Sequence, residues 1–329
     1  MQECKSGSFC IGTSRVRALC IPDGCVHAPL WSRCRKLGPM HVRPAGDHHG
    51  RGGRLAVVAT AVLLLGAYAG YAQRGPASRG GFRGRRNGPD VRFAAPGDFD
   101  GSFQFCRVVF RMIQGGDGGD WSVDWPRADW NLSTRLSELT KAPVSVDEKT
   151  GEPNTLMIQL SDPELFHCPF IMMTEVGNIY LDEVESKNLH DYLLKGGFLW
   201  ADDFWGNYAW QIWESQIRKV LPSGPYPFID LPLEHPIFHS VFTIPKFPQI
   251  PGIAFWMRSG GRTSERSDST VPHVRALVDE RGRIMVLITH NTDFGDAFEE
   301  EATNHQYFLE FSVPGYAFGV NALVYSMTH

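Results

Sequence analysis

The sequence predicts an α/β fold with a mostly parallel sheet, and three observations support this prediction. Strand-like and helix-like segments alternate after residue 100, which favours parallel strands joined by helical crossovers. Residues 189–206, LHDYLLKGGFLWADDFWG, form an amphipathic helix pattern that stops at two glycines and continues as an apolar strand. The run 169–174, PFIMMT, is wholly apolar, as expected for a central strand that is covered on both faces.

Charge and aromatic content divide the chain into two unequal parts. Residues 1–99 carry a net charge of +10, whereas residues 100–329 carry −14. Eight of the nine tryptophans follow residue 120, so nearly all the material for a hydrophobic core lies in the acidic part. We therefore predict a single folded domain over residues 101–329.

The region before that domain divides into three predicted parts. Residues 1–54 are expected to be a disordered basic leader, with Met40 as an alternative start. Residues 55–72, LAVVATAVLLLGAYAGYA, carry no charge and are either the hydrophobic part of a signal peptide or a transmembrane helix. Either interpretation predicts a cell-envelope location, exported or anchored, with membrane contact if the segment is not cleaved. Residues 73–100 are expected to be a disordered linker rich in Gly, Arg and Pro.

The arginine-rich linker has two possible roles. It resembles the RGG segments that bind nucleic acid through arginine and aromatic side chains. It also suits a juxtamembrane spacer whose arginines meet anionic lipid. We favour the spacer, because an exported protein would meet no nucleic acid, and we expect no nucleic-acid partner.

Hydrophobic periodicity places the elements of the predicted domain. The expected strands are residues 103–111, 155–160, 169–174, 198–201, 273–279 and 284–289. Helices are expected over residues 181–195, with Asp182 and Glu185 placed like a capping box, and over residues 210–221. Asp129 is expected to cap a further short helix.

Cysteine spacing argues against a zinc site that is formed by cysteines. Five cysteines precede residue 40 without a tight C-x-x-C pair, and only Cys106 and Cys168 follow. A disulfide between these two would be permitted in an oxidising compartment. The general tendency of cysteine to be buried favours two free thiols.

Polar residues follow several of the predicted strands, at the edge where open α/β sheets bind ligands. The candidates are Glu175, Asp202, Asp203, His290, Asn291 and Asp293. We hypothesise that they form a pocket for a divalent cation or a polyhydroxyl ligand, and that His290 biases the cation toward zinc or manganese. Asp202, Asp203 and His290 are the candidate catalytic and metal-binding residues. The alternative is that the aspartates cap helices or turns and that Glu175 pairs with a lysine.

Two further features have both a functional and a structural interpretation. His235, which precedes Pro236, is a candidate ligand or general base, although a structural role in a tight turn is favoured. The tryptophans of the segment 121–130, WSVDWPRADW, are candidates for stacking on a sugar ring. Core packing is the favoured interpretation of these tryptophans.

Several segments together resemble the domain of unknown function family 4159. They are DWP, DPELF…CPFIMM, LLKGGFLWADDFWG, DLPLEHPIFHSVF, GRIMVLITHNTDFGD and the ending GVNALVYSMTH. The resemblance covers residues 101–329 and implies a bacterial envelope protein. It also implies a flavodoxin-like three-layer α/β/α sandwich similar to class I glutamine amidotransferases. It implies no established reaction.

The residues argue against glutaminase activity. Glutaminases place a cysteine on the sharp turn after a central strand, and the comparable turn here is Ala201-Asp202-Asp203-Phe204. We therefore expect a ligand-binding or interaction module whose partner is an unknown small molecule or an envelope protein. The alternative is a metal-assisted hydrolase acting on a glycan or other envelope substrate through Asp202, Asp203 and His290.

Overall fold

The computed structural model describes residues 91–329. The predicted leader, the apolar segment 55–72 and all but the end of the predicted linker lie outside the described residues. No helix in the described part of the chain is long and apolar enough to cross a membrane.

A seven-stranded sheet with the order β3-β1-β4-β6-β9-β8-β7 organises the fold. The strands β3, β1, β4, β6 and β9 run parallel, β8 runs antiparallel to β9, and β7 runs antiparallel to β8. The prediction of a mixed α/β fold with a mostly parallel sheet is therefore confirmed. The strand bounds are β1 (Phe105–Val108), β3 (Thr155–Ile158), β4 (Phe170–Thr174), β6 (Phe198–Asp202), β7 (Ile229–Asp230), β8 (His273–Val278) and β9 (Ile284–His290).

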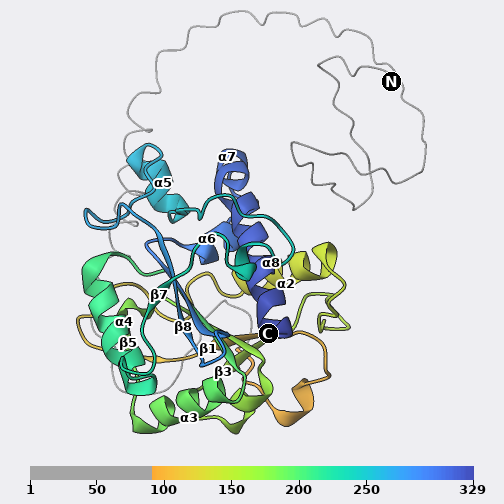
Figure 1. The fold of residues 1–329 in the computed structure, drawn as a ribbon. Helices are drawn as coiled ribbons and strands as arrows, with labels where there is room; N and C mark the ends of the chain where they lie inside the picture. The colour runs from red at the N-terminus through yellow and green to blue at the C-terminus, as the bar shows by residue number, and fades with distance from the viewer. Residues whose placement is uncertain (1–90) are drawn as a thin grey trace, which may run out of the picture. The chain divides into compact units, whose positions relative to one another are not determined.

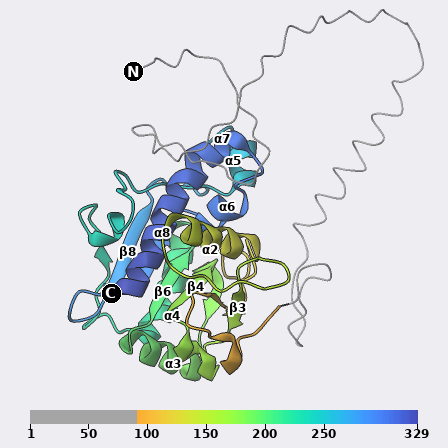
Figure 2. The same cartoon turned by 90° about the vertical axis from the view of Figure 1, so that its right-hand side faces the viewer.

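Helices cover both faces of the sheet (Figure 1). One hydrophobic core joins one sheet face to α2, α6 and α8, and the other joins the opposite face to α3 and α4. In Figure 2, α8 lies across the sheet with β8, β6 and β4 behind it. The helix bounds are α2 (Arg127–Leu139), α3 (Glu183–Leu194), α4 (Gly206–Val220), α5 (Ile253–Ser259), α6 (Phe294–Glu299), α7 (His305–Tyr307) and α8 (Val313–Thr328), with a π-helical turn, Phe308–Ser312, before α8.

The central strand β4 has the environment that its sequence predicts. All five residues of Phe170–Thr174 are buried, between β1 on one side and β6 on the other. The predicted strand 103–111 is divided instead into β1 and a short strand, β2 (Arg111–Met112). β2 leaves the main sheet and pairs antiparallel with β5 (Ile179–Tyr180).

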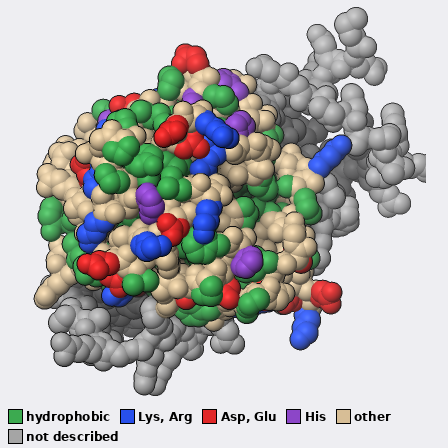
Figure 3. Space-filling view, turned by 60° about the horizontal axis from the view of Figure 1, so that its bottom comes forward, with side chains coloured by type: hydrophobic (Ala, Val, Ile, Leu, Met, Phe, Trp, Pro, Cys, Tyr) green, Lys and Arg blue, Asp and Glu red, His purple; other side chains and the backbone are tan. Residues whose placement is uncertain are grey.

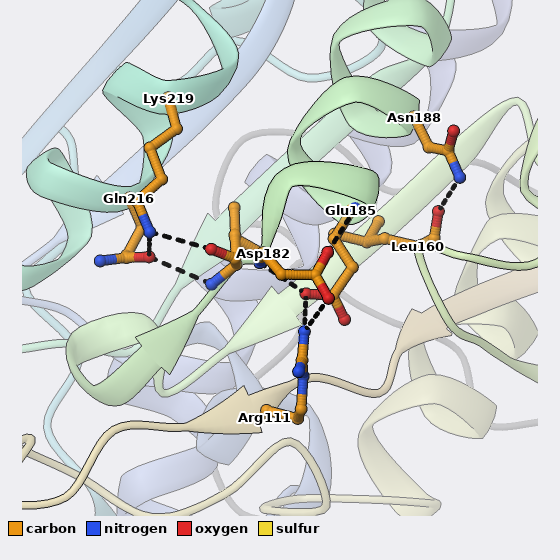
Figure 4. Close-up of polar contacts among 8 residues, drawn as sticks. Arg111, Leu160, Asp182, Glu185, Asn188, Gln216 and Lys219 are labelled. Atoms are coloured by element: carbon orange, nitrogen blue, oxygen red, sulfur yellow. Dashed lines mark hydrogen bonds and ion pairs between the residues drawn. The ribbon is translucent and has the colours of Figure 1, made fainter.

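The helix α3 begins at the predicted capping box (Figure 4). Asp182 accepts a hydrogen bond from the Glu185 backbone N–H, and Glu185 accepts one from the Asp182 backbone N–H, both at 2.9 Å. Arg111 of β2 donates to both carboxylates at 2.6 Å and so ties the two-stranded ribbon to this helix. These contacts are largely exposed, so we assign them little stability and a mainly local, orienting role.

The role predicted for Asp129 is wrong. Asp129 lies inside α2, where it is fully buried and pairs with Arg107 of β1, and it does not cap the helix. A buried guanidinium needs a carboxylate partner more than a helix terminus needs a cap, since an unpaired charge in the interior is far more costly.

The cysteine prediction is also wrong, because Cys106 and Cys168 form a disulfide. Their Cα atoms lie 6.2 Å apart, and both side chains are buried. The bond links β1 to the residues just before β4, and these two strands are neighbours in the sheet. Sequence spacing could not supply this proximity, because it arises from the strand order.

Loss of the disulfide is expected to lower the free energy of unfolding by about 2–4 kcal/mol, because the bond closes a long loop in the unfolded chain. The two residues are separated by 62 positions. Chemical denaturation of the Cys106→Ala, Cys168→Ala double variant measures the effect. Unchanged stability of this variant relative to the oxidised parent would contradict the expectation.

The surface mixes charges of both signs with apolar side chains on the face drawn in Figure 3. Lysine and arginine side chains lie among aspartates, glutamates and histidines on this face. This face therefore offers no continuous basic surface of the kind that binds a phosphate backbone.

Candidate functional site

A group of acidic side chains gathers where β6 and β9 end and α6 begins. Asp202 is the last residue of β6, Asp203 follows it, and Asp293 is the N-cap of α6. All three are buried. The structure therefore brings together three of the aspartates that the sequence placed at the carboxyl ends of strands.

Asp202 caps a helix, although not the helix that follows it in sequence. Its Oδ2 accepts hydrogen bonds from the backbone N–H groups of Phe294 at 2.9 Å and Gly295 at 3.3 Å, in the first turn of α6. Its Oδ1 accepts from the Thr289 hydroxyl. With these donors on both oxygens, Asp202 holds α6 against the sheet and contributes to the site mainly by position.

Asp203 and Asp293 come together with Asp124, which precedes α2. One carboxylate oxygen from each of the three lies within 4.8 Å of the others. Asp203 Oδ1 accepts from the Trp205 indole N–H at 3.0 Å, and Asp293 Oδ1 accepts from the Asp296 backbone N–H at 2.8 Å. In the described part of the chain, no N–H or hydroxyl group donates to Asp124 Oδ2, although the residue is only 6% exposed.

Asp124 also belongs to a second acidic group with Asp296 and Glu299 of α6. Here too, one oxygen from each residue lies within 4.8 Å of the others. Asp296 Oδ2 accepts from the Ile253 backbone N–H, and Glu299 Oε1 accepts from the Arg127 guanidinium at 2.8 and 3.1 Å. The two acidic groups therefore meet at Asp124.

Asp124 approaches α6 closely because position 295 is glycine. A Cβ atom on Gly295 would collide with Asp124 Oδ2. Glu175, at the end of β4, shows the same arrangement, since a Cβ on Gly118 would collide with its carboxylate. These glycines allow a carboxylate to lie directly on the backbone of a neighbouring segment.

The backbone is strained at three of these acidic residues. Asp124, Glu175 and Asp203 adopt left-handed conformations, with φ of 63°, 55° and 53°. Asn291, after β9, is the fourth non-glycine residue with positive φ among residues 91–329. Such strain costs about 1–3 kcal/mol per residue and is concentrated at functional sites in proteins generally.

Burial and mutual repulsion disfavour the charged form of these carboxyl groups and make them weak acids. Burial is the largest cause that raises the pKa values of Asp124, Asp203 and Asp293 well above their usual range, and the neighbouring carboxylates raise them further. Burial also raises the pKa of Glu175 to about 7 and that of Asp296 to about 6. A bound cation would remove the same penalty.

His290 does not join the acidic groups. Its Nε2 donates to the Gly206 carbonyl at 3.0 Å, and its ring lies against Phe204, Trp210 and His273. Burial lowers its pKa to about 4, so the ring is neutral near pH 7. The structure therefore gives His290 a packing position beside α4.

The remaining candidates are bound to backbone groups. Asn291 accepts from the Gly206 N–H at 2.8 Å and donates to the Val271 carbonyl at 2.8 Å. His235 Nδ1 accepts from the Ile237 N–H at 3.3 Å, and its ring lies against Tyr325. The Tyr325 hydroxyl in turn accepts a hydrogen bond from the backbone N–H of Ile284, the first residue of β9, at 3.3 Å. Since the acidic groups lie where β9 ends, His235 lies at the opposite end of the sheet.

The tryptophans of the segment 121–130 are partly buried. Trp121 and Trp125 lie against each other, with ring centroids 6.3 Å apart, and Trp121 packs on the core beneath α3 and α4. Trp130, inside α2, is also partly exposed. The three side chains therefore lie at the edge of the core, as the core-packing interpretation predicts.

Sequence reasoning missed Asp124, Asp296 and Glu299. Asp124 lies in the tryptophan-rich segment 121–130, where it follows no predicted strand. Asp296 and Glu299 follow Asp293 at intervals of three, a spacing that places all three near one face of a helix. This spacing would have indicated a shared acidic face if the sequence had also shown that residues 294–299 form a helix.

The fold and the site define an α/β protein with a buried acidic centre at the carboxyl edge of its sheet. Residues 105–327 match the family described as Domain of unknown function (DUF4159), and the chain belongs to this family. No curated protein matches the sequence.

Proposed function

We propose that this protein is an exported cell-envelope binding module in which Asp124, Asp203 and Asp293 hold a divalent cation. One observation carries the proposal: Asp124 is almost fully buried beside other carboxylates, no N–H or hydroxyl group of residues 91–329 donates to its Oδ2, and its backbone conformation is strained. A protein that gained nothing from this arrangement would be more stable with an amide or an apolar side chain there.

The donor set indicates the type of cation. All three side chains offer carboxylate oxygens, and His290 is not among the residues that converge on them within the described chain. The expectation of a zinc bias therefore loses its support, and oxygen-preferring cations such as Ca²⁺, Mg²⁺ or Mn²⁺ fit better.

The charge of the site indicates the class of ligand. Three carboxylates exceed the charge of one divalent cation, so the filled site carries no excess positive charge. Uncharged oxygens, from water or from a polyhydroxyl ligand, are therefore better suited than phosphate to complete the coordination. This preference supports a binding module more than a hydrolase that works through His290. His290 Nε2 donates to a backbone carbonyl, its Nδ1 has no partner within residues 91–329, and the residue belongs to neither acidic group in that range.

The scaffold and location are part of the same proposal. The mostly parallel sheet with helices on both faces is consistent with the flavodoxin-like, class I glutamine amidotransferase-like sandwich that the sequence suggests. The buried disulfide supports export, because such bonds persist in oxidising compartments.

The proposal predicts that Ca²⁺ or Mn²⁺ raises the melting temperature of the full-length protein by roughly 5–10 °C at a hundredfold excess over Kd. Asp124→Asn is expected to abolish this shift and to make the metal-free protein more stable, because it removes one of the repelling charges. A merely structural carboxylate would not produce this combination.

Two control variants sharpen the test. Asp191→Asn removes an exposed carboxylate of α3, and His290→Gln keeps a donor for the Gly206 carbonyl. Both are expected to retain the cation shift. Absence of any shift in the parent, or an equal shift in Asp124→Asn, would overturn the proposal.

A further inference from the structure

We infer that the acidic centre holds two divalent cations, with Asp124 as the bridging ligand and with Asp296 and Glu299 completing the second position. This inference rests on the proposed function, because the first position is the one formed by Asp203 and Asp293. It extends that function from a single cation to a cation pair.

The geometry of the two acidic groups carries the inference. Each group places three carboxylate oxygens within 4.8 Å of one another, and Asp124 is the only residue they share among residues 91–329. A carboxylate has two oxygens and can serve two cations at once. Paired divalent cations in proteins lie about 3.5–4 Å apart, a separation that one bridging carboxylate can span.

The environment of Asp124 supplies independent support. Within residues 91–329, no N–H or hydroxyl group donates to its Oδ2, although the residue is only 6% exposed. The oxygen lies against the first turn of α6, where Gly295 leaves room for it. An isolated structural aspartate would be expected to use both oxygens, as Asp202 does nearby.

The helix α6 explains why both positions arise together. Asp293, Asp296 and Glu299 recur at intervals of three at its N-cap and along its length, which directs them to neighbouring sides of Asp124. Each also has one oxygen to which no N–H group within residues 91–329 donates. The N–H donors reach the other oxygens, Asp293 Oδ1, Asp296 Oδ2 and Glu299 Oε1.

The arrangement also explains why the second position is the weaker of the two. Asp203 and Asp293 are buried, whereas Glu299 is partly exposed and is shared with Arg127. The guanidinium competes with a cation for the Glu299 carboxylate. We therefore expect the two cations to bind in sequence, with the second at lower affinity.

The test is the stoichiometry of Mn²⁺ binding to the full-length protein, measured by titration calorimetry and by the electron paramagnetic resonance signal. Two ions per chain are expected, with coupling between them that broadens the Mn²⁺ signal as the second ion binds. Glu299→Gln and Asp296→Asn are expected to weaken the second binding step more than about tenfold and to leave the first unchanged.

The controls separate this inference from the proposed function. Glu300→Gln changes a neighbouring carboxylate that also meets Arg127 but belongs to neither group, so it is expected to retain both ions. One ion per chain in the parent, unchanged in Glu299→Gln, would overturn the inference and leave the proposed function standing. No bound ion in the parent would overturn both.

Discussion

Replacement of Arg107 by methionine is expected to lower the free energy of unfolding by about 3–5 kcal/mol, because it leaves the Asp129 carboxylate buried without a counter-charge. Arg107 is 1% exposed and Asp129 is fully buried. The guanidinium donates to both carboxylate oxygens, so the pair is held in a single geometry. Urea denaturation of Arg107→Met against the parent measures the loss.

The same substitution is expected to weaken cation binding. Arg107 also donates to the carbonyls of Trp121 and Val123, both at 3.2 Å, and these residues lead directly to Asp124. Its positive charge favours the ionised form of Asp124, although burial and the acidic neighbours dominate there. Arg107 is therefore a positioning residue for the acidic centre, and its loss is expected to reduce cation affinity as well as stability.

The double variant Arg107→Met, Asp129→Leu provides the control for this prediction. Replacing both charges with apolar groups of similar size removes the unpaired carboxylate, so the stability should return most of the way to that of the parent. The bonds to Trp121 and Val123 remain absent, so cation affinity should stay low. A single variant within about 1 kcal/mol of the parent would contradict the expected role of the buried pair.

The sequence predicted best the elements whose signals are local. Strand β4 is an uninterrupted apolar run, and α3 carries its capping box within its own first turn. The helix α8 was not predicted from periodicity, because its buried residues, Gly315–Tyr316 and Phe318–Leu323, are almost continuous and form no single stripe. An apolar side chain does not always mark the core either, since Val184 of α3 is 58% exposed.

The candidate site was predictable only in part, because its partners are distant in sequence. Asp202 and Asp203 follow a recognisable strand, so their place at the edge of the sheet could be inferred. The donors that occupy Asp202 lie about ninety positions later, and the sequence alone does not identify them. The role of Arg107 was not predictable for the same reason. In the sequence it is a charged residue in an apolar strand, and only the fold brings Asp129 of α2 against it.

Between pH 5 and pH 7.5 the metal-free protein is expected to lose stability as the pH rises. In the folded state, burial raises the pKa of Asp202 and of Glu175 to about 7 and that of Asp296 to about 6. In the unfolded chain these groups lose their protons near pH 4. The folded state therefore retains protons that the unfolded state has released, and its stability falls until the pH passes the folded pKa values.

The magnitude of this effect is several kcal/mol. One pKa unit corresponds to about 1.4 kcal/mol, and the folded pKa of Asp202 lies about two units above pH 5, so this residue alone contributes about 3 kcal/mol across the window. His290 acts in the opposite sense, because burial lowers its pKa to about 4 and its folded form releases a proton that the unfolded form keeps up to about pH 6.5. Above that pH its contribution no longer changes, so the carboxylates determine the trend near neutrality.

A divalent cation is expected to restore the stability that the metal-free protein loses as the pH rises, because the cation replaces the protons on the buried carboxylates. Cation binding requires ionised ligands, so Ca²⁺ competes with protons at the centre and stabilises the fold more at pH 7.5 than at pH 5. Free energies of unfolding measured at both pH values, with chelator and with excess Ca²⁺, test the expectation. Stability that rises with pH in the presence of chelator would mean that the acidic residues are held as stable anions by the protein itself. The centre would then have no need of a cation to neutralise it.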